Sequence, residues 1–252
     1  MITSTQNDKV KLVYGLQNRP RARRKERKIV LEGTRLIHDA LNQSYQPDFV
    51  LYQPEKVDYQ LIAQLQAINA ALIPVNDEVM RYVSDTQAPQ GIVAVFPMPM
   101  PKIPQKPRRV LILDSIREPG NMGTILRTAA AAGRDVIILT PDCVDPYNPK
   151  VLRSGMGAHF RVPILEAQWF EIKQYCESLE IYLATGNGDL RYDQVDWAIP
   201  HAVIIGNEAH GAGTYADEVA TRRIFIPMAA QTESLNAAVA AGVILFEAAK
   251  LL

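Results

Sequence analysis

The sequence predicts an α/β protein whose C-terminal part is a parallel sheet covered by helices. Short apolar runs such as RVLILD (109–114), VIILT (136–140) and AVIIG (202–206) alternate there with helical patterns. Continuous apolar runs bounded by turn residues are typical of strands buried on both faces of a parallel sheet. The 252 residues are 48% hydrophobic and 21% charged, a globular composition that excludes a disordered chain.

A small α/β module is predicted before this sheet. Residues 28–43 read as a short strand that enters an amphipathic helix, and residues 48–52 read as a second strand. A helix is expected over 58–70, and a last strand over 91–96. The module therefore alternates strands and helices around its own core.

The C-terminal elements follow in the same manner. A helix over 121–133 follows the strand at 109–114, and further strands are expected at 181–185 and 223–227. The last helix, roughly 234–252, is apolar on nearly every side, so it needs cover beyond one sheet face. That cover is either a subunit interface or the core of the chain itself.

A proline-rich stretch, PMPMPKIPQKP (97–107), separates the two parts. Five prolines remove backbone donors and favour an extended, stiff linker. We expect an N-terminal domain at 1–100, a linker at 101–108 and a C-terminal domain at 109–252.

The sequence shows no apolar leader and no run of about 18 apolar residues, so neither a secretory signal nor a membrane span is expected. The two cysteines, Cys143 and Cys176, match neither a disulfide framework nor a metal site. A cytoplasmic protein without a metal ion is the expectation.

Net charge is zero, but the first 35 residues carry ten Lys and Arg against three acidic residues, a local excess of +7. Clustered cations raise the local potential and displace counterions from a phosphate backbone, which favours nucleic acid as the partner. The alternative is a solvated helix face without a partner. The densest run contains the candidate RNA-binding residues Arg19, Arg21, Arg23, Arg24, Lys25, Arg27 and Lys28.

Three segments place Gly, Asn, Glu or Ser directly after predicted strands, at 113–133, 203–213 and 226–242. Ligands of parallel sheets bind beyond these strand ends. In the first segment Asn121 is expected to cap a helix, with Arg127 six residues on and on much the same side. In the second, Gly206 leaves backbone that a flat ligand can approach. In the third, Ser234 is the expected N-cap of the last helix.

Other chemistries lack their motifs. The four histidines form no zinc-binding pattern with a carboxylate, and neither GxxxxGK[ST] nor GxSxG occurs. Gly211, Gly213 and Ala216 spell GxGxxA, but a dinucleotide fingerprint needs its first glycine immediately after the strand, and here GNEAH intervenes.

Taken together, EPGNMGTILRTAAAAG, IIGNEAHG and IPMAAQTESLNAAVA closely resemble the three signature motifs of the SpoU (TrmH-type) RNA ribose 2′-O-methyltransferases of the SPOUT superfamily. The likeness covers residues 109–250. More loosely, VLEGTRLIHDAL resembles the RNA substrate-binding domain that many members carry. The resemblance implies a parallel-sheet domain with a deep trefoil knot, a homodimer formed through that domain, and S-adenosylmethionine as the cofactor.

The resemblance also implies site residues. The implied catalytic set is Asn121, Arg127, Glu208, Ser234 and Asn236. The implied cofactor-binding set is Thr185, Gly186, Gly206, Ile226, Met228, Ser234, Leu235 and Ala238. Glu118 stands where aspartate is commoner in the first motif, which keeps the charge.

The expected activity is methylation of a ribose 2′-hydroxyl in structured RNA, with ribosomal RNA favoured over transfer RNA. Two alternatives stay open: a Rossmann-type dinucleotide enzyme that uses the Gly211 region, and an RNA-binding protein without catalytic activity. No residue identifies the target nucleotide, because RNA is read through its shape and unstacked loops.

Overall fold

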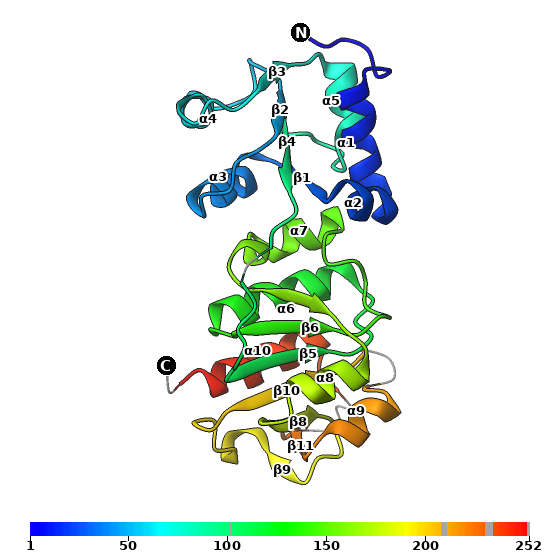
Figure 1. Ribbon diagram of the computed structural model, residues 1–252, viewed down its shortest axis with the longest axis vertical. Helices are drawn as coiled ribbons and strands as arrows, with labels where there is room; N and C mark the ends of the chain where they lie inside the picture. The colour runs from blue at the N-terminus through cyan, green and yellow to red at the C-terminus, as the bar shows by residue number, and fades with distance from the viewer. Residues whose placement is uncertain (101, 208–210, 230–233, 251–252) are drawn as a thin grey trace. The chain divides into compact units, whose positions relative to one another are not determined.

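A computed structural model describes residues 1–252 except 101, 208–210, 230–233 and 251–252 (Figure 1). The chain divides into two compact units. One comprises Met1–Met100 together with Tyr147–Phe160, and the other comprises Pro101–Pro146 and Arg161–Leu252.

The N-terminal unit is built on a four-stranded sheet of order β1-β4-β2-β3. Its strands are β1 (Lys28–Glu32), β2 (Phe49–Tyr52), β3 (Leu72–Pro74) and β4 (Ile92–Pro97). Only the β2–β3 pair is parallel; β4 is antiparallel to both of its neighbours. The strands predicted at the start of 28–43, at 48–52 and at 91–96 are confirmed.

Helices cover both faces of this sheet (Figure 1). The helices of the unit are α1 (Asp8–Asn18), α2 (Pro20–Glu26), α3 (Thr34–Asn42), α4 (Tyr59–Ala67), α5 (Asp77–Val83) and α7 (Pro149–Gly155), with a 3-10 turn η1 (Ala158–Phe160). One core contains Val10 and Val13 of α1 with Val79 of α5. The opposite core contains Ile37 of α3, Leu61 of α4 and Leu152 of α7. The helix predicted within 28–43 and the helix predicted over 58–70 therefore pack on the same face.

The C-terminal unit is built on a seven-stranded sheet of order β7-β6-β5-β10-β8-β11-β9, and every neighbouring pair is parallel. Its strands are β5 (Arg109–Leu113), β6 (Val136–Leu139), β7 (Ile164–Glu166), β8 (Glu180–Ala184), β9 (Leu190–Arg191), β10 (His201–Ile205) and β11 (Arg222–Phe225). The predicted parallel sheet is confirmed. Its central strands are buried throughout, as their continuous apolar runs require.

Two pairs of helices cover this sheet (Figure 1). They are α6 (Pro119–Ala131) with α10 (Ala237–Ala248), and α8 (Trp169–Tyr175) with α9 (Thr214–Val219); a 3-10 turn η2 (Tyr192–Gln194) follows β9. Ile172 of α8 and Ala216 of α9 pack against Val110 and Ile112 of β5. Among the described residues, no helix combines the length and the apolar character that crossing a membrane requires.

Two predicted helix caps are wrong. The N-cap of α6 is Glu118, whose carboxylate accepts a hydrogen bond from the backbone N–H of Asn121, so Asn121 lies inside the first turn. The N-cap of α10 is Asn236, two residues beyond the predicted Ser234. In both cases the predicted cap and the observed cap are polar residues two or three positions apart, and the tertiary path of the loop decides which of them begins the helix.

Candidate functional site

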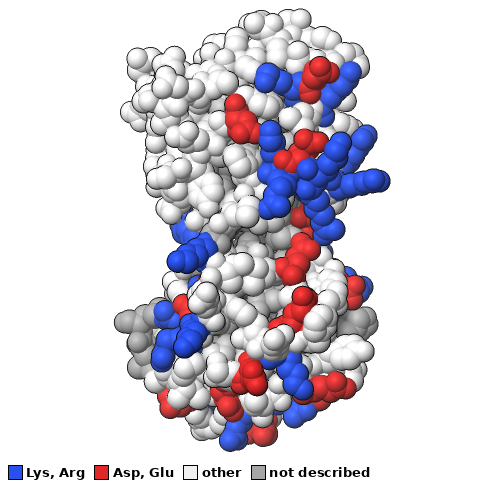
Figure 2. Space-filling view, viewed as in Figure 1, with Lys and Arg blue, Asp and Glu red and all other residues white. Residues whose placement is uncertain are grey.

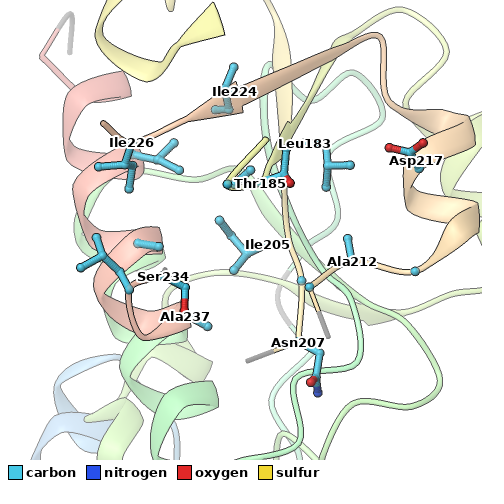
Figure 3. Close-up of a pocket in the computed structure, with 18 of the residues that line it drawn as sticks. Leu183, Thr185, Ile205, Asn207, Ala212, Asp217, Ile224, Ile226, Ser234 and Ala237 are labelled. Carbon is cyan, nitrogen blue, oxygen red and sulfur yellow. The ribbon is translucent and has the colours of Figure 1, made fainter. Parts of the chain in front are cut away.

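A cavity of about 650 Å³ opens at the carboxyl ends of β8, β10 and β11, beside the start of α10 (Figure 3). Figure 3 shows Leu183, Ile205 and Ile226 around this space, with Ser234 and Ala237 along the start of α10. The volume falls within the range of small-molecule sites, and the lining combines apolar side chains with a few polar groups. The cavity lies where the strand order of a parallel sheet places its ligands.

Seven of the eight predicted cofactor-binding residues line this cavity: Thr185, Gly186, Gly206, Ile226, Met228, Ser234 and Leu235. The eighth, Ala238, is not among the lining residues, whereas Ala237 is. The backbone N–H of Ala238 donates to Asn236 Oδ1 at 2.9 Å, which is part of the α10 cap. The structure thus brings the predicted set together, and its role in binding stays a prediction.

Gly206 ends β10 at a point where the chain passes very close to itself. A Cβ built on Gly206 would lie 2.2 Å from the backbone nitrogen of Ala212. The intervening turn is closed by two backbone hydrogen bonds of 2.9 Å between Asn207 and Gly211, and Gly211 has a φ of +70°. Glycine is therefore required at 206 by the returning loop itself, as well as by any ligand that approaches from the cavity.

Asn236 joins the first motif to the third. Its Oδ1 caps α10, and its Nδ2 donates to Asn121 Oδ1 at 3.0 Å. Because the capping contact assigns the oxygen of the Asn236 amide, its nitrogen is directed toward α6. Two predicted catalytic residues, 115 positions apart in sequence, are in direct contact next to the cavity.

Arg127 is placed differently. Six residues advance about 600° around a helix, which leaves Arg127 about 120° away from Asn121 around the axis of α6. Its side chain is exposed, and among the described residues it neither lines the cavity nor forms an ion pair. Glu208, the other charged member of the predicted catalytic set, lies outside the described residues.

Several residues of the site escaped the sequence analysis. Asp217 of α9 lines the cavity, and its carboxylate is held by Arg223 at 2.7 Å, a contact that lowers the pKa of Asp217. Asp114 and Thr140 lie buried directly after β5 and β6, and the Thr140 hydroxyl donates to Asp114. Asp114 also accepts the backbone N–H of Gly213, in the loop after β10. The available signal was their position: a polar residue directly after a buried parallel strand.

The basic segment of the N-terminal unit is helical. Figure 2 shows Lys and Arg side chains gathered over the surface of α1 and α2. Arg19, Arg21, Arg24, Lys25 and Arg27 are exposed there, and Lys28 pairs with Asp48 at 2.8 Å.

Arg23 differs from its neighbours in α2. Only 2% of its surface is exposed, and its guanidinium donates to the backbone oxygen of Leu16 at 2.6 Å, at the end of α1. It satisfies a helix end within the fold, so we leave it out of the proposed RNA-binding surface.

Burial shifts the pKa of both cysteines and of one histidine. Burial raises the pKa of the Cys176 thiol to about 12, and it also raises the pKa of Cys143. Burial lowers the pKa of His201 to about 4. The described residues contain no group of three or more His, Cys, Asp or Glu placed to hold a metal ion.

Comparison with known proteins identifies the family. Residues 108–246 match the model of the SpoU rRNA Methylase family, and residues 7–94 match the MRM3-like substrate binding domain. The chain belongs to the SpoU rRNA methylase family. All three motif segments of this SpoU chain fall within the matched residues, which removes the reason to interpret Gly211 and Gly213 as a dinucleotide fingerprint.

Relatives of this SpoU methylase cover it along most of its length. The 23S rRNA (guanosine(2553)-2′-O)-methyltransferase RlmP of Bacillus subtilis is 31% identical, over 97% of each chain. The mitochondrial rRNA methyltransferase 3A of Danio rerio is 35% identical over 89% of this chain, which spans 64% of that longer protein. The crystal structure of an AdoMet-bound rRNA methyltransferase from Sinorhizobium meliloti superposes with a TM-score of 0.86 at 29% identity, over 100% of this chain and 97% of that one.

Proposed function

We propose that this protein transfers a methyl group from S-adenosylmethionine to a ribose 2′-hydroxyl of ribosomal RNA. The observation that carries the proposal is the contact between Asn236 and Asn121, because Asn236 lies between Leu235 and Ala237, which both line the cavity. This contact joins motif one to motif three beside a cavity that Gly206 and Asn207 of motif two also line. The names of the relatives, which are rRNA methyltransferases, favour ribosomal over transfer RNA.

The cavity suits a flat nucleoside with a polar tail. Apolar side chains of Leu183, Ile205 and Ile224 offer surface for a purine, and backbone groups at Gly206 and Leu235 offer hydrogen bonds to its edge. We assign cofactor binding to the seven lining residues of the predicted set. The bound cofactor supplies a methyl group made electrophilic by its sulfonium.

The residues of the chain then have to prepare the acceptor. With the cofactor bound, the ribose oxygen would take its methyl group, the electron pair of the broken carbon–sulfur bond would stay on sulfur, and the hydroxyl proton would leave to solvent or a nearby base. We assign Arg127 to orient and acidify this hydroxyl. Asn121, Glu208, Ser234 and Asn236 position the sugar and the loop. Alignment of this kind can supply about 7 kcal/mol of the barrier reduction.

The N-terminal domain, residues 1–100, is proposed to hold the RNA. The exposed cations of α2 give it affinity for phosphates, which does not depend on sequence. Its likeness to a substrate-binding domain supports this division from the catalytic domain at 109–252. A relative that covers 97% of this chain is bacterial, so we place the reaction in the cytoplasm, where bacteria make ribosomal RNA.

We further propose a homodimer formed through α10. Val239 and Phe246 are 51% and 54% exposed, and with Val243 they occupy positions i, i+7 and i+4 on one side of this helix. Its other side packs on α6. An apolar helix with one uncovered side fits a second copy of the same chain. The trefoil knot implied by the resemblance is likewise a proposal, supported by the insertion of β10 between β5 and β8.

Methyl transfer itself tests the function. With labelled cofactor and ribosomal RNA, we expect incorporation at one 2′-oxygen, mapped in total RNA with and without the protein. Arg127→Ala should reduce turnover by about 100-fold or more while cofactor affinity is retained, because an exposed side chain outside the cavity contributes little to that binding. Arg35→Ala, an exposed arginine of α3, serves as the control.

Two outcomes of the methyl-transfer assay would contradict parts of the proposal. Full turnover in Arg127→Ala would remove the proposed role of that residue. RNA binding without any incorporation by the wild-type protein would favour the non-catalytic alternative.

A further inference from the structure

Asp114 is a buried carboxyl group for which the sequence analysis assigned no role. It follows β5 directly and is 4% exposed. Its Oδ2 accepts the backbone N–H of Gly213 at 2.7 Å, and its Oδ1 accepts the hydroxyls of Thr140 and Ser115, each at 3.2 Å. Among the described residues, no Lys or Arg forms an ion pair with it.

These contacts connect the ends of three adjacent strands. Asp114 follows β5, Thr140 follows β6, and Gly213 closes the loop that leaves β10. Thr140 Oγ1 also accepts the backbone N–H of Ser115 at 3.0 Å. The hydrogen bond from Thr140 thus fixes the orientation of the Asp114 carboxyl group, so that its other oxygen faces the backbone N–H of Gly213.

The loop that Asp114 holds is the wall of the cavity. Gly206, Asn207, Gly211, Ala212 and Gly213 all line it. The Asn207 side chain donates to the backbone oxygen of Ser115 at 2.7 Å and is directed away from the cavity (Figure 3), so both ends of the loop are tied to the segment after β5. This double attachment determines where the returning backbone crosses Gly206.

We infer that Asp114 is a positioning residue for cofactor binding, which keeps the loop after β10 in the shape that lines the cavity. The inference rests on the proposed function for the identity of the ligand. Its physical basis is independent of that identity: burying a carboxyl group is unfavourable unless donors compensate, and here the donor of the shortest contact belongs to the cavity wall.

The test compares two aspartates that flank the same sheet. Asp135 also accepts backbone N–H groups, from Arg108 at 2.7 Å and Arg109 at 2.9 Å, but at the opposite end of β5. Asp114→Ala should weaken binding of S-adenosylmethionine, measured by calorimetry, about tenfold or more, as expected for loss of a hydrogen bond to a buried acceptor. Asp135→Ala should leave this affinity unchanged. The weaker binding should appear as a raised KM for the cofactor in Asp114→Ala, whereas Asp135→Ala should keep the wild-type KM.

Amide hydrogen exchange of the ligand-free protein is a second, independent measurement of how firmly the loop is held. Amides of the described residues between 203 and 216 should exchange faster in Asp114→Ala than in Asp135→Ala, because only the first change releases the loop. This measurement remains valid even if the wild-type protein transfers no methyl group, which separates failure of the inference from failure of the proposed function.

Asp114→Asn decides between hydrogen bonding and charge. An asparagine can direct its oxygen at the Gly213 N–H and its amide at Thr140, so cofactor affinity should return to within about threefold of wild type. Thr140→Val, which removes one anchor without unfolding a strand, should give an intermediate loss. Unchanged affinity and exchange in Asp114→Ala, or an Asp114→Asn variant as impaired as the alanine, would overturn the inference.

Discussion

His201 shows how burial determines what a titratable residue does. It begins β10 and has no exposed surface; its ring lies 5.0 Å from that of Trp197. Its Nδ1 lies 2.8 Å from the backbone oxygen of Ile199, and its Nε2 lies 2.9 Å from Arg134 Nη1. This arrangement suits a neutral ring that donates through Nδ1 and accepts through Nε2. A histidine held neutral by its surroundings is a structural group.

The pH dependence of stability follows from this burial. Burial, helped by the positive charges of Arg134 and Arg109, lowers the pKa of His201 to about 4; the contact with the Ile199 carbonyl and the charge of Asp135 oppose this shift. Between the ordinary histidine value of about 6.5 and about 4, the unfolded chain takes up a proton that the folded chain refuses, so the free energy of unfolding falls by up to about 3 kcal/mol as the pH drops through this window. In His201→Gln this contribution should be absent in urea unfolding at pH 4 and pH 7.

A matched variant isolates the effect. His38→Gln, at an exposed histidine of α3, should keep the pH dependence of the wild-type protein. Identical stability curves for His201→Gln and wild type across pH 4–7 would contradict the assignment.

At the scale of the residue, the sequence predicted which residues belong to the site better than it predicted which of them touch. Asn236 and Asn121 were both selected, yet their hydrogen bond depends on α10 lying against α6. The sequence analysis missed Asp114 and Thr140 because their role depends on the hydrogen bond between them, which forms only when β5 and β6 lie side by side. Arg23 was grouped with its exposed neighbours because a basic run does not reveal which side of its helix is covered.

At the scale of elements, the fold of α2 places most of its basic side chains on one exposed surface. Proline at its first position and the left-handed Arg27 at its end bound a helix of seven residues. One side of α2 packs against α1, so the exposed cations lie together on its other side. The whole N-terminal stretch cannot be removed to test this surface, because Val10, Val13 and Leu16 of α1 belong to the core.

Charge removal on α2 is the appropriate experiment. Replacing Arg19, Arg21, Arg24 and Lys25 by Ala should reduce the slope of log affinity for RNA against log salt by about 3, at about 0.7 to 0.9 for each lost phosphate contact. Filter binding over a range of salt concentrations measures the slope, and Arg35→Ala on α3 is the control. An unchanged slope in the fourfold variant would mean that α2 is a solvated surface.

At the scale of the whole molecule, the chain crosses between its two units three times. It leaves the N-terminal unit after Met100, returns to it for Tyr147–Phe160, and leaves again at Arg161. Leu152 and Phe160 of this returning segment are buried in the core that contains Phe96. Nothing in the local pattern of 147–160 predicts this, because its apolar residues would suit either core.

The returning segment predicts where a mutation acts. Phe160 packs 4.7 Å from the ring of Tyr45, so Phe160→Ala should cost about 3–5 kcal/mol and raise hydrogen exchange within residues 28–96. Trp197→Ala, at a buried aromatic of the other unit, should raise exchange in the C-terminal sheet instead. Unaltered exchange in 28–96 for Phe160→Ala would show that the segment does not support that core.

Assembly adds a further prediction. Because Arg127 does not line the cavity of its own chain within the described residues, we expect it to serve the cavity of the second copy. Arg127→Ala and Gly206→Ala should each be inactive alone, the latter through the 2.2 Å contact with Ala212. Mixed in equal amounts and allowed to exchange, they should recover about a quarter of wild-type turnover, since half of the dimers are mixed and each has one intact site. Mixed dimers, detected by native mass spectrometry, without recovered activity would rule out this arrangement.

The sequence by itself determined the secondary structure class, the parallel sheet and the three motifs, because strand burial and glycine-bearing turns are local properties with local signals. It also determined the basic character of the N-terminal segment. Only the tertiary structure decided which polar groups meet after β5, β6 and β10, which cap begins α10, which arginine of α2 is buried and which core takes residues 147–160. Each of these depends on contacts between residues far apart in the chain, whose free energy exists only once the strands lie side by side.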